Sequence, residues 1–91
     1  MNWELIFTDT YQKREVRFLK RHPELRQPYY KTLQLLEANP FHPSLRLHPL
    51  KGKLKGLYSI SINLSYRLTL EFLIQEHSLL LVNLGDHDTV Y

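Results

Sequence analysis

Two stretches in the second half of the chain alternate apolar and polar residues with the period of a β-strand. In "LYSISI" (57–62) the apolar side chains at even positions share one face, and "YRLTLEFLI" (66–74) repeats the pattern. The three residues between them have the length of a tight hairpin loop. The sequence therefore predicts an antiparallel hairpin with one buried face, and this hairpin restricts the possible folds more than any other feature.

The first half of the chain has the helical period instead. Thr8 offers an N-cap for a helix that we expect to stop at His22, because the residue before a proline is disfavoured in the α region. A second helix is predicted from about Glu24 to Ala38, and Pro40 follows its end. Its apolar stripe, which we expect in the core, consists of Leu25, Tyr29, Leu33 and Leu36.

Short strands are also expected near both ends of the chain. The segment "WELIF" (3–7) alternates, and "SLLLVNL" (78–84) is apolar on both faces, which is typical of a central strand. The order is then strand, helix, helix, strand, strand, strand. We predict an α+β fold, a small antiparallel β-sheet with an N-terminal helical hairpin packed on one face, as a single domain over residues 1–91. The other face of the sheet is predicted to be open.

The composition excludes several kinds of site. The 91 residues include no cysteine, so the chain forms no disulfide and no thiolate metal site, and no ligand spacing is typical of a metal centre. We therefore expect no metal and no cofactor. The start of the chain lacks the pattern of a signal peptide, and its longest apolar run, "LLLV", is far below the roughly 20 residues that span a bilayer. A cytoplasmic protein without membrane contact is expected.

Positive charge is concentrated in the middle of the chain. The formal net charge is +3, but no Asp or Glu occurs from Ala38 to Leu70. Such a one-signed field attracts polyanions, of which nucleic acid is the commonest in the cytosol. The alternative is a solvated, lysine-rich loop without a ligand. The basic side chains of this region are Arg46, Lys51, Lys53, Lys55 and Arg67.

Arg67 is the candidate phosphate ligand on the open face. The alternation turns Arg67 away from the helices, and the predicted turn places it opposite Ser61. There its guanidinium can meet a phosphate with two hydrogen bonds. In the alternative, Arg67 pairs with Glu71 on its own strand. If the strand before the turn extends backwards, the lysines of residues 51–55 and Arg67 line one groove.

The tail "GDHDTVY" supplies candidate groups for proton transfer. Cleavage of RNA through its own 2′-hydroxyl needs a base, an acid and cations that stabilise the charged phosphorane, but no metal. His87 titrates in the right pH range, and the flanking aspartates can favour its charged form or fix its tautomer. Tyr91 can stack on a splayed base or donate a hydrogen bond. A surface histidine between aspartates is also common in proteins without any catalytic role.

The chain resembles the RelE/ParE superfamily of toxins from bacterial toxin–antitoxin pairs, both in the order of its elements and in three segments. These segments are "HPLKGKLKGLYSISIN", "YRLTLEF" and "LLLVNLGDHDTVY". The RelE/StbE and YafQ-like branch is the most similar. The resemblance implies a ribosome-dependent endoribonuclease, an mRNA interferase, that cuts translated mRNA and is silenced by a cognate antitoxin. An acidic segment of that antitoxin is expected to cover the basic face of the sheet. The oligomeric state of such a complex stays open.

The resemblance also implies roles for single residues. Arg67 matches the arginine that contacts the scissile phosphate. His87 matches a catalytic position after the last strand, and Tyr91 matches the aromatic residue that ends the active-site segment. His48 matches a histidine used in the YafQ-like branch. The side chains expected to bind RNA are Lys51, Lys53 and Lys55, with Arg46 beside them.

Several assignments stay open at this point. In the hairpin region, the YafQ-like branch has aspartates where this chain has Ser59 and Ser65, so the acid and base roles are not assigned. ParE-like members share the fold but inhibit DNA gyrase and cut nothing, and a fold alone does not separate the two activities. His87 and Tyr91 favour the nuclease. A third interpretation is a basic RNA-binding module without toxicity.

Overall fold

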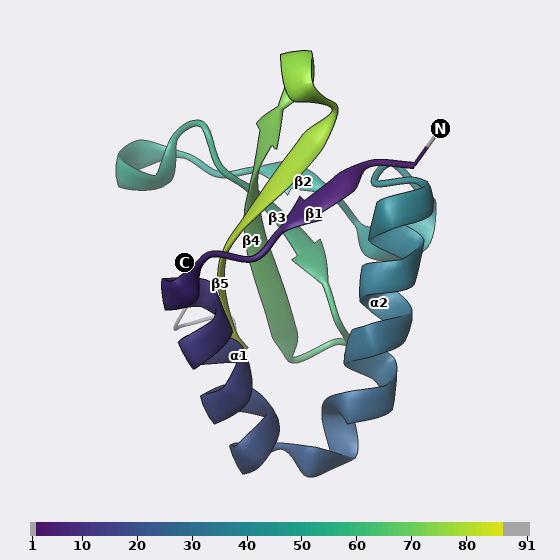
Figure 1. The fold of residues 1–91 in the computed structure, drawn as a ribbon, viewed down its shortest axis with the longest axis vertical. Helices are drawn as coiled ribbons and strands as arrows, with labels where there is room; N and C mark the ends of the chain where they lie inside the picture. The colour runs from purple at the N-terminus through teal and green to yellow at the C-terminus, as the bar shows by residue number, and fades with distance from the viewer. Residues whose placement is uncertain (1, 87–91) are drawn as a thin grey trace.

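The computed structural model describes residues 2–86, which form two helices and a five-stranded sheet (Figure 1). The helices make a hairpin that lies against one face of the sheet (Figure 1). This arrangement confirms the predicted α+β class. In chain order the elements are β1 (Glu4–Ile6), α1 (Asp9–Arg21), α2 (Arg26–Ala38), β2 (His48–Pro49), β3 (Tyr58–Ser61), β4 (Tyr66–Leu73) and β5 (Ser78–Asp86).

The ends of α1 lie where the sequence predicts them. The hydroxyl of Thr8 accepts a hydrogen bond of 3.1 Å from the backbone N–H of Tyr11 and caps the first turn. The helix ends at Arg21 because Pro23 disfavours the α conformation at His22. Both boundaries therefore follow from local sequence.

α2 begins at Arg26, slightly later than predicted, because residues 23–25 form a 3₁₀ turn. Pro28 lies in its first turn, where a missing N–H breaks no helical hydrogen bond. No helix within residues 2–86 has the length and apolar character needed to cross a membrane. The predicted apolar stripe is buried as expected, at Leu25, Tyr29, Leu33 and Leu36.

The five strands lie in the order β1-β5-β4-β3-β2. β3 and β4 pair in the predicted register, with Ser61 opposite Arg67 and Ser59 opposite Thr69. β5 lies between β4 and β1, which agrees with its apolar residues on both faces. The sheet is mixed rather than purely antiparallel, because β1 runs parallel to β5. A helical hairpin instead of a tight turn connects β1 to the other strands, so no local constraint forces an antiparallel pair.

The connection between α2 and β3 contains a strand that the sequence does not predict. His48 and Pro49 form β2 and pair with Ser59 and Tyr58 of β3. Proline is tolerated at this position because β2 is the edge strand of the sheet. Two residues are too few to show a period of two, so the pattern reads as a proline-rich loop.

The lysine-rich segment after β2 is a loop and does not extend β3. Residues 52–54 form a 3₁₀ turn, and β3 begins only at Tyr58. Gly52 and Gly56 have φ angles of 66° and 98°, in the region that favours glycine and interrupts a strand. The condition under which the lysines and Arg67 line one groove, a strand that extends backwards over the lysines, is therefore not met.

Two buried tyrosines join the helices across the core. The hydroxyl groups of Tyr11 and Tyr29 lie 2.7 Å apart, and Tyr29 donates a hydrogen bond of 2.6 Å to the Glu15 carboxylate. Burial raises the pKa of both phenols far above the ordinary value, and the neighbouring Glu15 carboxylate adds to the rise. Both hydroxyls therefore stay protonated near neutral pH and serve as structural donors.

The face of the sheet away from the helices is less open than predicted. Ser59 is 0% exposed and Thr69 is 2% exposed. Ser59 has Arg67 and Glu71 as diagonal neighbours on β4, and such long side chains shield a short one between them. The face therefore presents the ends of long side chains rather than a flat platform of small residues.

Candidate functional site

Strand register aligns a row of polar residues across the sheet. His48 of β2 stands opposite Ser59 of β3, which stands opposite Thr69 of β4, and Thr69 pairs with Asn83 of β5. Residues directly opposite one another point to the same face, here the face away from the helices. Arg67 lies on the same face, two residues along β4 from Thr69. Two of the predicted site residues, His48 and Arg67, therefore share one surface.

The separation of His48 and Arg67 suits a shared ligand. They lie two strands apart and two residues apart along the strands. With a strand spacing of about 4.8 Å and a rise of about 3.3 Å per residue, their Cα atoms are roughly 12 Å apart. An extended phosphodiester chain that lies across β3 can span this separation and contact both side chains.

The guanidinium of Arg67 has a hydrogen-bond partner at one nitrogen and, among residues 2–86, none at another. One terminal guanidinium nitrogen donates a hydrogen bond to the hydroxyl of Ser61. The Nε atom of Arg67 is buried and has no hydrogen-bond partner among the described residues. A buried N–H without a partner costs about 1–3 kcal/mol, which a bound anion would recover.

The alternative of an Arg67–Glu71 ion pair is not what the structure shows. Within residues 2–86 the ion pair found joins His22 to Glu24, at 3.6 Å between nitrogen and oxygen. Arg67 turns instead toward Ser61, across the hairpin. The guanidinium charge is therefore not neutralised by the carboxylate on its own strand.

His48 is an exposed side chain whose tautomer is set by a backbone carbonyl. Its Nδ1 lies 3.1 Å from the carbonyl oxygen of Arg46, which can only accept a hydrogen bond. In the neutral ring the proton is thus assigned to Nδ1, and Nε2 is the basic nitrogen. The direction of this carbonyl follows from the backbone of Arg46, which has a left-handed conformation with a φ of 52° after a short 3₁₀ turn. This local turn therefore fixes the orientation of the His48 ring.

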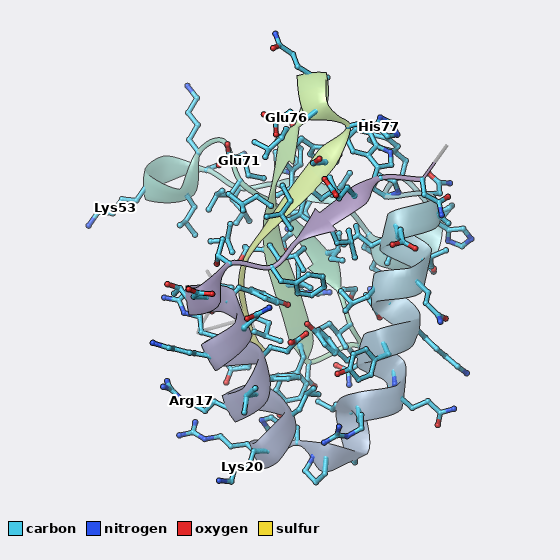
Figure 2. The ribbon with its side chains drawn as sticks, in the orientation of Figure 1. Arg17, Lys20, Lys53, Glu71, Glu76 and His77 are labelled. Carbon is cyan, nitrogen blue, oxygen red and sulfur yellow. The ribbon has the colours of Figure 1, made fainter. Side chains whose placement is uncertain are left out.

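The lysines lie apart from Arg67. Lys51, Lys53 and Lys55 are all exposed in the loop that leads into β3, whereas Arg67 pairs with the last residue of that strand. In Figure 2, Lys53 projects from this loop into solvent, away from the body of the sheet. The continuous strand on which a shared groove depends is not formed. Arg46, also exposed, belongs to the turn before β2.

His87 and Tyr91 lie outside the described residues. β5 ends at Asp86, which stands opposite Tyr66, so His87 directly follows this end of the sheet in the sequence. The catalytic roles of His87 and Tyr91 stay predictions. Among residues 2–86, no group of three or more His, Asp or Glu side chains is arranged to hold a metal ion.

A second group of basic side chains, on α1, is absent from the predicted site. Arg14, Arg17 and Arg21 are spaced by three and four residues, so they lie along one face of the helix. They line a hollow of about 380 Å³ beside the end of β5. The spacing is visible in the sequence, but only the fold shows that this face borders a hollow.

The fold is that of known bacterial toxins. A YafQ mutant from E. coli superposes with a TM-score of 0.79 at 20% identity, over 98% of each chain. YafQ in the E. coli DinJ–YafQ toxin–antitoxin complex gives a TM-score of 0.77 at 17% identity, over 100% of this chain and 99% of that one. The chain has the fold of the RelE/ParE toxins. The fold that the sequence resemblance predicts is thus confirmed.

A metal-bound toxin from Helicobacter pylori has the same fold. It gives a TM-score of 0.76 at 27% identity, over 98% of this chain and 99% of that one. At the level of sequence alone, no family model and no curated protein matches the chain. The RelE/ParE toxin fold is therefore identified by structure and not by sequence comparison.

Proposed function

We propose that this chain is the toxin of a type II toxin–antitoxin system and acts as a ribosome-dependent mRNA endoribonuclease. The observation that carries the proposal is the placement of Arg67 and His48 on one face of a full-length YafQ-like fold. The Nε of Arg67, which has no hydrogen-bond partner among residues 2–86, and the tautomer assigned to His48 fit the handling of a phosphodiester group. The acid-free segment from residue 38 to 70 supplies the positive field that attracts RNA.

The proposed reaction is an in-line transfer within the RNA. The 2′-hydroxyl loses its proton to a base and attacks the adjacent phosphorus, and the bond to the 5′-oxygen breaks as that oxygen takes a proton. His87 is the principal proton-transfer group, with Tyr91 assisting and His48 as the second candidate. Arg67 stabilises the charge of the phosphorane. The lysines of residues 51–55 hold the RNA, and the reaction needs no metal.

A cognate antitoxin is the proposed protein partner. The DinJ–YafQ complex shows that a protein with this fold assembles with an antitoxin. An acidic segment of the antitoxin would complement the basic surface of this chain. Phe41, which is 63% exposed, could add an apolar contact with the antitoxin. The antitoxin would silence the toxin by covering His48 and Arg67.

Inhibition of DNA gyrase is the second candidate function. The YoeB/ParE toxin from Agrobacterium tumefaciens gives a TM-score of 0.67 at 20% identity, over 92% of this chain. In that case Arg67 would bind no scissile phosphate. The third candidate, an RNA-binding module without toxicity, predicts no growth defect at all.

One experiment separates the three candidates. The chain is expressed from an inducible promoter in a bacterial host, and mRNA integrity and plasmid supercoiling are followed together. We expect cut transcripts with normal supercoiling. Altered supercoiling with intact transcripts would support the gyrase inhibitor, and unimpaired growth would support the RNA-binding module.

A further inference from the structure

The hollow between α1 and the end of β5 forms a second basic site, separate from His48 and Arg67. Three guanidinium groups of α1 line the hollow with the Asp86 carboxylate, and the Glu24 carboxylate lies 3.6 Å from the ring of His22; three cations against two carboxylates leave an excess of positive charge. In Figure 2, Arg17 projects outward from the side of α1. Arg14 is fixed by its hydrogen bond of 3.0 Å to the carbonyl oxygen of Val82. Arg17 and Arg21 are the exposed cations that remain for a ligand.

The inner wall of this hollow is aromatic. Tyr66 packs edge-on against Phe18, with ring centroids 5.5 Å apart, and its ring lies 4.7 Å from that of His22. Tyr66 and His22 are each half-buried and both line the hollow. A ring against a packed wall can stack on a base with little loss of side-chain entropy. Arginines beside such rings are the combination that binds single-stranded nucleic acid.

We propose that the α1 hollow binds one nucleotide of a single-stranded RNA segment. Arg17 and Arg21 would contact its phosphate, and its base would lie against Tyr66 and His22. The volume of about 380 Å³ is at the small end of ligand sites, which suits a single unstacked nucleotide and not a duplex. A polyglutamate peptide would use the arginines but has no aromatic ring to stack on Tyr66 and His22. The choice of RNA as the ligand rests on the proposed function; the site itself does not.

The test compares two double variants of α1 with equal loss of charge. Arg17→Gln/Arg21→Gln removes the cations of the hollow, and Lys13→Gln/Lys20→Gln removes two exposed cations of the same helix that do not line it. Binding of a short 2′-O-methyl RNA is followed by fluorescence anisotropy across a salt series. This RNA lacks the attacking hydroxyl, so the result does not depend on cleavage.

The arginine variant should bind more weakly, and its slope of log affinity against log salt should fall by about 0.7, because both arginines contact the same phosphate. The lysine variant should keep most of the wild-type slope. Equal slopes in the two variants would overturn the proposal. Cytidine monophosphate should also compete with the RNA more strongly than inorganic phosphate does, because the base adds stacking. Competition by a polyglutamate peptide at least equal to that of the nucleotide would assign the hollow to a protein partner instead.

Discussion

Arg67 donates a hydrogen bond to the hydroxyl of Ser61, the residue directly opposite it in the β3–β4 pair. Ser61 in turn donates a hydrogen bond of 3.0 Å to the carbonyl oxygen of Asn63, in the turn that joins the two strands. The hairpin therefore orients the guanidinium through its own turn. The buried Nε of Arg67 is then aimed by the backbone and not by a charged partner.

Replacing Arg67 by lysine should lower cleavage by about two to three orders of magnitude, the usual effect of losing one donor to a developing negative charge. Lysine keeps the charge but loses the planar fork and the Nε donor. The matched control is Arg26→Lys, at an exposed arginine of α2 to which no role in RNA binding is assigned. Cleavage rates on a ribosome-bound mRNA check the prediction. Equal rates for the two variants would show that Arg67 contributes charge alone.

Replacing Tyr29 by phenylalanine should destabilise the fold by about 1–3 kcal/mol. The change removes the hydrogen bond to Glu15 and leaves the buried hydroxyl of Tyr11 without its partner. Tyr30→Phe is the control, because Tyr30 is adjacent in sequence but 44% exposed. Urea denaturation measures both variants. A Tyr29 variant as stable as the Tyr30 variant would mean that water replaces the lost bonds.

The same tyrosine pair should make stability fall above about pH 10, the ordinary pKa of a phenol. The pKa of each phenol is raised in the folded state, so below pH 10 both states hold the protons and the stabilisation is complete. Above pH 10 the unfolded chain loses these protons first, and each tyrosine lowers the free energy of unfolding by about 1.4 kcal/mol per pH unit. The Tyr11→Phe/Tyr29→Phe variant, which retains the titrating lysines, should show a shallower decline between pH 10 and 11. An unchanged decline would assign the effect to other groups.

The hairpin was the most predictable part of this fold. Its alternation and three-residue turn determine that Ser61 faces Arg67, and the structure confirms it. The burial of Ser59 was not predicted, because the period of a strand gives the direction of a side chain but not whether its long diagonal neighbours fold over it. β2 was not predicted, because a strand of two residues, one of them a proline, is too short to show alternation.

The candidate site divides in the same way. The sequence places Arg67 and His48 among the candidates, but only the pairing of β2 with β3 shows that they share a face. The lysines share a groove with Arg67 only if β3 extends backwards, and two glycines with positive φ prevent that extension. The arginines of α1 acquire a role only from the hollow beside β5, which depends on contacts distant in sequence.

Replacing Lys51, Lys53 and Lys55 by glutamine should weaken RNA binding and flatten its salt dependence without loss of stability. All three side chains are exposed in a loop, so their removal breaks no core contact. For single-stranded RNA, each lost phosphate contact should lower the salt slope by about 0.7. Lys13, Lys20 and Lys31, exposed on the helices, provide the matched triple variant. If both triple variants change the slope equally, the loop has no special role in binding.

Tyr91 should contribute to cleavage mainly through its ring. Tyr91→Ala should impair cleavage, and Tyr91→Phe should retain more activity because stacking on a base does not need the hydroxyl. Single-turnover rates with saturating toxin separate this effect from binding. Equal impairment in both variants would identify the hydroxyl as the group that matters.

Cleavage of an mRNA positioned on purified ribosomes, by the wild type and His87→Ala side by side, tests the central claim most directly. The wild type should cut the mRNA, and His87→Ala should be slower by about two to four orders of magnitude, the range for a lost general acid or base. Ribosome binding should be equal for both proteins. Uncut mRNA with the wild type would contradict the proposed nuclease activity. Full activity in His87→Ala would exclude His87 from proton transfer and leave His48 as the candidate for that role.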